Sequence, residues 1–531
     1  MKKFKKIASL VLAASMIGAM PVSVLAATNE TTGATTELGA TAKISTESDR
    51  TFEVYQIFTG DLSDGKLSNL KWGSNGTGTK DHVVPDDVIK ALTDLNKEGK
   101  TYADKLAIIE TYANMKNPVG TVTKDSPWTG RTGYYIFKDV TALKDGESYS
   151  LNVTLVNGDT EIKPKAGTTT SEKKVKDTND TTGDTSDWKD SADWDVNDVI
   201  PFQLKATIAE DYANYTKGYK LTFHDNESAG LTFNEESVVV KVDGKDVATS
   251  AYSVVKGTEK ENPCTFEVHF ENLKDIADVK AGSVITVDYT ATLNEKAKIG
   301  SEGNPNESHI TFTNNPNDNQ AGENGKTPND KVIVFTYQVE ANKYIGNADG
   351  TKGEALNGAS FTLYKMVADS KTEGVQKGSD IKAALKKQDA TKSVNTDAFE
   401  DGSYYVSLGE VDGSDKNTFL WKRIDDGKYV LVETKTPAGY NSKEAMSFEV
   451  KATHTDGDEP ALSALNGDKL VGNITLTAYV PTGKLSTDVL NVSGSQLPTT
   501  GGMGTTILYV AGAILVIAGG AVLVIKKRHE A

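Results

Sequence analysis

The sequence predicts a mainly β protein built from tandem β-sandwich domains with a few inserted helices. The body of the chain is rich in Thr, Val, Gly, Asn and Asp. Short runs in which apolar and polar residues alternate recur along it, separated by turn residues, which is typical of strands with one buried face. Helical spacing is confined to a few segments. Without its two ends, the 531-residue chain has room for about three domains.

The N-terminus has the pattern of a secretory signal peptide over residues 1–26. A lysine-rich start is followed by an apolar stretch and then by Val24-Leu25-Ala26-Ala27, a small-residue cleavage site. The protein is therefore expected to be exported. Its single cysteine, Cys264, cannot form an internal disulfide, so durability must come from packing or from another crosslink. We interpret Cys264 as a small buried hydrophobe and not as a reactive thiol.

The first predicted domain covers residues 27–167. Residues 86–95 and 102–115 have helical spacing and are expected to form helices inserted among strands. Alternating runs predict strands at 50–58, 133–137 and 149–156. The stretch "FEVYQIFTGDLSDGKLSNLKWG" resembles the N-terminal domain of Gram-positive major pilins. No set of catalytic residues is evident in this domain.

A polar segment that contains Pro and Gly, "EIKPKAG", ends the first domain and is expected to be an exposed linker. It resembles the pilin motif of the same family. The resemblance implies that Lys165, directly after Pro164, is the acceptor lysine. Its amine would attack the acyl-sortase formed on Thr500 of another subunit. The motif has Lys163 in place of the family's tyrosine and Ala166 in place of its asparagine, so Lys163 is a competing acceptor.

An acidic loop follows this linker. Eight carboxylates raise the possibility of Ca²⁺, which prefers oxygen ligands. The alternation and closing glutamate of an EF-hand are missing, so a solvated acidic loop without metal is the preferred interpretation. The residues are Asp177, Asp180, Asp184, Asp187, Asp190, Asp193, Asp195 and Asp198.

The second predicted domain covers residues 168–330. About seven short strands separated by turns predict an immunoglobulin-like sandwich. The stretches "YKLTFHDNESAGLTF" and "ITVDYTATLNEKAKIGSEGNPNESHITFTNNPND" resemble the middle domain of major pilins, a Cna B-type fold with an autocatalytic Lys–Asn isopeptide bond. The resemblance implies the lysine, the amide and the acid of that bond. They are Lys173 (or Lys174), Asn314 (or Asn315) and Asp225.

The third predicted domain covers residues 331–495 and is expected to open with a strand at 332–345. Its stretch "GKYVLVETKTPAGY" matches every defined position of the E-box of Cna B-type domains, "YxLxETxxPxGY". Alternation places Tyr429, Leu431 and Glu433 on one face of a strand. Because Leu431 is expected to be buried, Glu433 also points inward, where a carboxylate without a role would be costly. The resemblance implies an isopeptide bond between Lys343 and Asn491, with Glu433 as the acid.

The chemistry expected of both sets depends on burial, which lowers the pKa of a lysine and raises that of an acid. A neutral amine can then attack the asparagine carboxamide carbon. The protonated acid donates to the carbonyl oxygen and shuttles protons as ammonia leaves. The fold supplies proximity, so no external enzyme is needed. By analogy with disulfides, closing a loop of this size adds ~4–5 kcal/mol.

The C-terminus, residues 496–531, combines three signals in order. An apolar run at about 507–525 is long enough to span a bilayer as a helix, and the basic cluster at 526–528 would hold its end in the cytoplasm. The order resembles the LPXTG cell-wall sorting signal. The resemblance implies that sortase cuts before the final glycine of the motif and that the membrane span is transient. The motif is Leu497, Pro498, Thr499, Thr500 and Gly501.

These features predict a structural backbone subunit of a covalent pilus, attached to the cell wall at the cell surface. The alternative is a monomeric LPXTG wall-anchored adhesin, which needs no acceptor lysine. The expected partners are a pilus-class sortase, a housekeeping sortase, other copies of the chain, minor pilins and peptidoglycan. No cofactor is expected. The six histidines share no motif, and no nucleophile–histidine pairing or HExxH is present, so an exported enzyme is poorly supported.

Overall fold

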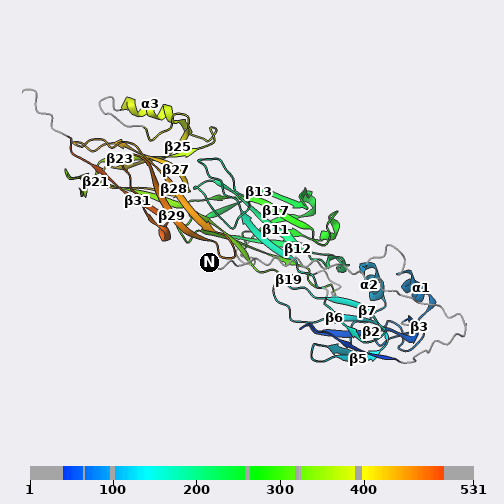
Figure 1. Cartoon of the computed structure of the whole chain (residues 1–531). Coiled ribbons are helices and arrows are strands. Elements are labelled where there is room, and N and C mark those ends of the chain that lie inside the picture. Colours follow the sequence, from blue (N-terminus) through cyan, green and yellow to red (C-terminus); the bar gives the residue numbers. More distant parts are fainter. Residues whose placement is uncertain are drawn as a thin grey trace, which may run out of the picture.

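The computed structural model describes residues 40–63, 66–95, 102–164, 166–257, 264–316, 322, 325–388 and 397–494. The predicted signal peptide and the predicted sorting signal with its membrane span lie outside these residues. Within the described ranges, no helix has the length and apolar character needed to cross a membrane. Three β-rich domains follow one another along an elongated molecule, in chain order (Figure 1).

The first domain contains a central sheet, a small second sheet and two helices. The small sheet packs its inner face, with Ile44, against Phe52 and Phe137 of the central sheet. The central sheet has the order β3 (Lys66–Trp72), β2 (Phe52–Ser63), β6 (Gly133–Asp139) and β7 (Leu151–Val156), with β4 (Gly120–Val122) on β2. The small sheet has the order β5 (Trp128–Arg131), β1 (Thr41–Ser45) and β8 (Thr160–Glu161).

Both helices predicted in this domain are present, as α1 (Asp86–Asp94) and α2 (Tyr102–Thr111). Helix α1 follows Pro85 and has two aspartates in its first turn, where negative charge complements the helix dipole. Val88 and Leu92, four residues apart, lie on its buried side. They contact the apolar cluster of the central sheet, so the helices cover one face of this sheet.

The middle domain is a sandwich of two sheets around one large apolar core. Strand β17 shows strict alternation of buried and half-buried residues, as expected of a strand in such a sandwich. One sheet has the order β14 (Lys245–Asp246), β13 (Leu231–Val242), β17 (Val284–Leu293), β11 (Val199–Thr207) and β9 (Thr170–Val175). The other has the order β10 (Ser191–Asp193), β20 (Asp330–Phe335), β18 (Asn304–Phe312), β12 (Leu221–Glu227), β16 (Phe266–Phe270) and β15 (Ser253–Lys256), with β19 (Gly325–Lys326) on β18.

The C-terminal domain is a second sandwich, with the helix α3 (Gly378–Gln388), which the sequence analysis did not predict. Its first and last strands lie side by side in parallel, with Lys343 opposite Val489. One sheet has the order β22 (Lys352–Ala355), β21 (Tyr337–Gly346), β31 (Lys484–Asn491) and β30 (Thr477–Tyr479), with β26 (Thr418–Ile424) on β21. The other has the order β24 (Gln376–Lys377), β25 (Tyr404–Gly413), β23 (Ala359–Val367), β27 (Gly427–Lys435), β28 (Met446–Thr455) and β29 (Ala461–Val471).

The long strand predicted at 332–345 is divided between two domains. Strand β20 belongs to the middle domain's sheet, beside β18, and β21 belongs to the C-terminal domain. Thr336 separates them, and its hydroxyl donates to the carbonyl of Ile424 at 3.1 Å. The predicted domain border at 330/331 therefore precedes a strand that the middle domain uses. The buried positions are even-numbered in β20 up to Val334 and odd-numbered in β21 from Tyr337, and the sequence between them contains no Gly or Pro that would mark the change.

Candidate functional site

The C-terminal domain brings together the three residues expected to form its isopeptide bond. The ammonium of Lys343 contacts Oδ1 of Asn491 and lies 3.2 Å from Oε1 of Glu433. The amide of Asn491 donates to both Glu433 oxygens, at 2.8 and 3.0 Å. The side chains of Lys343 and Glu433 are fully buried. Amine, amide and carboxylate therefore touch one another in a closed set.

Local strand patterns explain this arrangement. Lys343 follows Val339 and Ala341 on the buried face of β21, and Asn491 ends the neighbouring strand β31. Glu433 comes from β27 in the facing sheet, where Leu431 is also buried, as alternation predicted. Oε2 of Glu433 also accepts a hydrogen bond of 2.7 Å from a backbone N–H just after the E-box. This bond holds the carboxylate toward the amide.

The electrostatics of this site favour a nucleophilic amine. Burial lowers the pKa of Lys343 to about 8, although the charge of Glu433 acts in the opposite direction. At pH 7, about a tenth of the amine is then neutral. Its nitrogen also lies 5.6 Å from the centre of the Phe361 ring, so the surroundings are apolar. The lone pair needed for attack on the amide carbon is therefore available at physiological pH.

The middle domain contains a second set of the same type. Nζ of Lys173 contacts Asp225 and donates to the hydroxyl of Tyr289 at 2.8 Å. The Tyr289 hydroxyl donates to Asp225 at 2.9 Å and accepts from the amide of Asn306 at 2.9 Å. None of these four side chains is more than 2% exposed. The tyrosine thus links the lysine to Asn306, an amide that the sequence analysis did not single out.

Asn314, the amide predicted for this site, lies elsewhere. It follows the end of β18, and its side chain donates to the carbonyl of Glu147 in the first domain at 3.3 Å. Asn315, the alternative, lies beyond the strand as well. Asn314 lies outside the Lys173 set in the structure, because β18 runs from Asn304 to Phe312 and its inward-facing amides come earlier in the chain. Alternation across "NPNESHITF" puts both Asn304 and Asn306 on the inner face, and the contact with Tyr289 selects Asn306.

The lysine doublet is separated by the strand register. Lys173 lies opposite Leu204 on the buried face of β9. Lys174 points the other way and forms an ion pair with Asp190. Burial lowers the pKa of Lys173 and raises the pKa of Asp225, although each group's charge counteracts the shift of the other. Of the two lysines, Lys173 is therefore the one placed for nucleophilic attack.

Glu227 is a further acid that the sequence analysis missed. It lies directly opposite Asn306 in the pairing of β12 with β18. Among the described residues, neither its carboxylate oxygens nor Oδ1 of Asn306 has a hydrogen-bond partner. Burial and the charge of Asp225 raise the pKa of Glu227 to about 8, so the group is mostly protonated at pH 7. A protonated Glu227 has a proton to donate toward an amide oxygen.

The predicted linkage residues fall largely outside the described part of the chain. Lys165 and the sorting motif at 497–501 are not described. Lys163, the competing acceptor, is described: its side chain is 75% exposed and lies 3.8 Å from Glu161. An exposed lysine of this kind is accessible to an enzyme. Its ion-pair partner Glu161 is on the surface as well.

The acidic loop is only partly solvated: Asp184 and Asp187 are exposed, but other aspartates of the loop are buried or paired, contrary to the prediction. Lys365 of the C-terminal domain, whose side chain is 1% exposed, forms ion pairs with Asp180 at 2.6 Å, Asp195 at 2.5 Å and Asp425 at 2.5 Å. Burial alone would lower the pKa of Lys365, but Asp195 and Asp425 raise it well above its ordinary value. Lys365 is therefore a fixed cation that binds the loop to the next domain, and its ammonium occupies the centre of these carboxylates.

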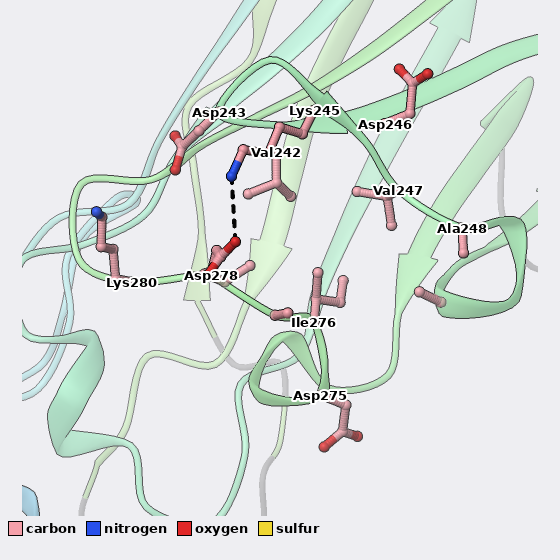
Figure 2. A pocket seen from close by; sticks show the side chains of 13 residues that line it. Val242, Asp243, Lys245, Asp246, Val247, Ala248, Asp275, Ile276, Asp278 and Lys280 are labelled. Atoms are coloured by element: carbon pink, nitrogen blue, oxygen red, sulfur yellow. Dashed lines mark hydrogen bonds and ion pairs between the residues drawn. The ribbon is translucent and has the colours of Figure 1, made fainter.

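A surface hollow of about 780 Å³ is lined by residues of the middle domain (Figure 2). It is bordered by the turn after β13 and by the segment 275–280. Lys245 and Asp278 form an ion pair of 3.4 Å across it. Both side chains are largely exposed, and no histidine or cysteine lines the hollow. It holds none of the residues of either lysine–amide–acid set.

Comparison with known proteins finds similarity to pilus components in three parts of the chain. Residues 196–316 match the model of the Gram-positive pilin backbone subunit 2, Cna-B-like domain. Residues 344–459 match the SpaA prealbumin-like fold domain, and residues 491–531 match the LPXTG cell wall anchor motif. These matches confirm the predicted resemblance to Gram-positive backbone pilins and the predicted sorting signal.

A curated relative is the trypsin-resistant surface T6 protein of Streptococcus pyogenes serotype M6. It is 26% identical over 373 residues, which are 61% of this chain and 64% of the relative. The chain is thus aligned with less than two thirds of that relative's length. Similar solved structures include the T6 backbone pilin of S. pyogenes (18% identity, 86% of this chain, 98% of that chain, TM-score 0.47) and the major pilin SpaD of Corynebacterium diphtheriae (15%, 86%, 98%, 0.43).

Proposed function

We propose that this chain is the structural backbone subunit of a sortase-polymerised pilus on a Gram-positive cell surface. The observation that carries the proposal is the presence, in one chain, of a pilin backbone domain at 196–316 and an LPXTG anchor motif at 491–531. An anchor motif alone fits any wall-attached protein. A backbone domain together with the motif fits a subunit that is added repeatedly.

Polymerisation in this proposal joins Thr500 of one subunit to Lys165 of the next. A pilus-class sortase cleaves the Thr500–Gly501 bond and holds the Thr500 carbonyl as an acyl-enzyme. The amine of Lys165 attacks that carbonyl, an amide forms, and the enzyme is released. Each linkage leaves one free donor and one free acceptor, so the contacts are heterologous and the fibre stays open-ended. A housekeeping sortase attaches the finished fibre to peptidoglycan, and minor pilins join it.

Internal isopeptide bonds supply the durability that disulfides cannot. We assign them to Lys343–Asn491 with Glu433 as acid, and to Lys173–Asn306 with Asp225 as acid. In each, the lysine Nζ–Cγ bond forms, the asparagine Cγ–Nδ2 bond breaks, and a proton passes through the acid to the departing ammonia. Direct contacts of amine, amide and acid support the first assignment. The second is supported by the contact of Lys173 with Asp225 and by the Tyr289 hydroxyl, which binds both Lys173 and Asn306.

The two bonds would carry a pulling force on the fibre in different ways. Lys343 and Asn491 are on neighbouring parallel strands at the two ends of the C-terminal domain's sequence. A bond there carries a pulling force between the first and last strand without loading their hydrogen bonds. Lys173 and Asn306 lie on opposite sheets of the middle domain, so a bond there ties the sandwich together across its core.

The proposal is tested by co-expressing the protein with a pilus sortase and separating wall extracts by mass. The wild-type chain should give a ladder of covalent oligomers. Lys165→Ala should abolish the ladder, and the matched variant Lys163→Ala should retain it. A ladder that persists in Lys165→Ala but disappears in Lys163→Ala would move the acceptor to Lys163. Wall-attached monomer without any ladder in the wild type would favour the alternative, a single wall-anchored adhesin.

A further inference from the structure

The outer face of one middle-domain sheet carries a cluster that neither the linkage chemistry nor the isopeptide bonds use. Strand β12 points Asp225 into the core and His224 outward. In the strand register His224 lies opposite Glu267 of β16 on one side and opposite His309 of β18 on the other. Cys264, the only cysteine of the chain, lies two residues before β16. Three residue types that bind metals therefore meet on one sheet face.

Their ligand atoms converge. Nδ1 of His224 is 2.6 Å from Oε1 of Glu267 and 3.7 Å from Sγ of Cys264. All three ligand atoms lie within 4.8 Å of one another. The side chains are mostly buried, at 15% exposure for His224 and 9% for Glu267. A hydrogen-bonded His–Glu pair is common on sheets. Here Sγ of Cys264 also lies near Nδ1 of His224, the nitrogen that Glu267 binds. A His–Glu pair does not need a neighbouring thiol, so this is an independent observation.

A second layer of contacts orients these groups. Nε2 of His224 pairs with the Thr311 hydroxyl at 2.9 Å, which leaves Nδ1 directed at the cysteine and the glutamate. The other oxygen of Glu267 binds Nε2 of His269 at 2.8 Å, and His269 in turn binds the Thr222 hydroxyl at 3.1 Å. Metal-binding histidines and carboxylates are typically held in this way through their remaining polar atoms.

We propose that His224, Cys264 and Glu267 form a binding site for a divalent transition metal, with Zn²⁺ as the best fit. Thiolate, imidazole and carboxylate are all zinc ligands, and three protein ligands leave a fourth tetrahedral position for water or an outside group. With ordinary Zn–S and Zn–N lengths, a tetrahedral site needs an S–N separation of about 3.6 Å, close to the 3.7 Å observed. On metal binding, the separation of His224 Nδ1 and Glu267 Oε1 must widen by about 0.8 Å from its present 2.6 Å.

The charges balance in the bound state. The cysteine gives up its proton to solvent and binds as thiolate, the histidine binds as neutral imidazole, and Glu267 binds as carboxylate. Two negative ligands neutralise Zn²⁺. A bound metal would tie the segment before β16 to β12 and shield the thiol from oxidation outside the cell. This site lies on the face opposite Lys173, so it does not depend on the proposed function.

The test uses the full-length protein, stripped with EDTA and titrated with Co²⁺ and then with Zn²⁺. Co²⁺ should give one equivalent of cobalt–thiolate charge-transfer absorption, and Zn²⁺ should abolish it by displacement. Cys264→Ser should lose the absorption, and Glu267→Gln should weaken Zn²⁺ binding at least about tenfold. His82→Gln, a change at an exposed histidine of the first domain, should bind as the wild type does.

Two further readings make the test decisive. Metal-free unfolding curves of Cys264→Ser and the wild type should coincide, which separates loss of the site from loss of the fold. Ca²⁺ should neither produce nor displace the thiolate signal, which excludes the acidic loop as its source. A wild-type protein without the charge-transfer absorption, or a Cys264→Ser variant that retains it, would overturn the proposal.

Discussion

Replacing Asn306 by alanine is the sharpest test of the middle-domain assignment, because structure and sequence pattern disagree there. Asn306 lies beside the Lys173–Asp225–Tyr289 set, whereas Asn314 contacts the first domain. Asn306→Ala removes the carboxamide that the amine must attack. The Lys173 amine then stays free, and the protein retains about 17 Da of mass that ammonia loss would otherwise remove.

The effect on stability follows from the length of the closed loop. About 130 residues lie between Lys173 and Asn306, and a crosslink over such a loop adds about 5 kcal/mol in the chain-entropy treatment. For a domain of this size, losing the stability that the crosslink adds corresponds to a decrease in Tm of about 10–20 °C.

The assay combines intact mass, tandem mass spectrometry of the tryptic crosslinked peptide, and calorimetry. Asn314→Ala is the matched control, since it removes the same side chain at the position predicted from the sequence. We expect Asn314→Ala to retain the crosslink and most of the stability of the domain. If Asn314→Ala loses the Lys173 crosslink while Asn306→Ala keeps it, the geometric assignment is refuted.

Three further predictions concern the C-terminal domain and its joint with the middle domain. Glu433→Ala should block the Lys343 crosslink, as read from a mass about 17 Da higher, whereas Glu444→Ala, an exposed change nearby, should leave the mass unchanged. In Asn491→Ala the amine stays free, and its pKa of about 8 lies below the unfolded value. Between pH 8 and 10.5 the folded state then binds fewer protons than the unfolded state, so the free energy of unfolding should rise by up to about 3 kcal/mol over this range. The comparison is the double variant that also carries Lys343→Met. If the difference in unfolding free energy between the two variants does not change with pH, the reasoning is contradicted. Lys365→Met should destabilise the joint by about 3–5 kcal/mol at pH 7, because it leaves three carboxylates without their cation. The loss should be smaller at pH 5, because burial raises the pKa of Asp425 and this carboxylate is protonated more fully there. Equal losses in calorimetry at both pH values would count against this account.

The sequence alone determined the features that depend on local order. Alternation over two residues predicted the sandwiches and the inward direction of Glu433, because the face of a strand residue follows from its parity. The spacing of apolar residues predicted α1 and α2. The E-box and the sorting motif are contiguous, so no knowledge of distant contacts was needed to recognise them. The resemblance to Cna B-type domains, recognised from the E-box, implied Lys343, Asn491 and Glu433, and the structure brings the three together.

Only the tertiary structure decided which distant residues meet. Alternation along the strand predicts that Asn306 faces inward, but it does not predict that Asn306 lies near Lys173. That proximity depends on strand pairing, which is set by contacts between residues far apart in the sequence. The division at Thr336 depends on which of two cores each strand enters, and no Gly or Pro interrupts the sequence between the two strands. A run of aspartates has the composition of a solvated loop until Lys365 of another domain provides the buried cation. The convergence of His224, Cys264 and Glu267 likewise exists only in the folded sheet, because only strand pairing places the thiol, the imidazole and the carboxylate within reach of one ion.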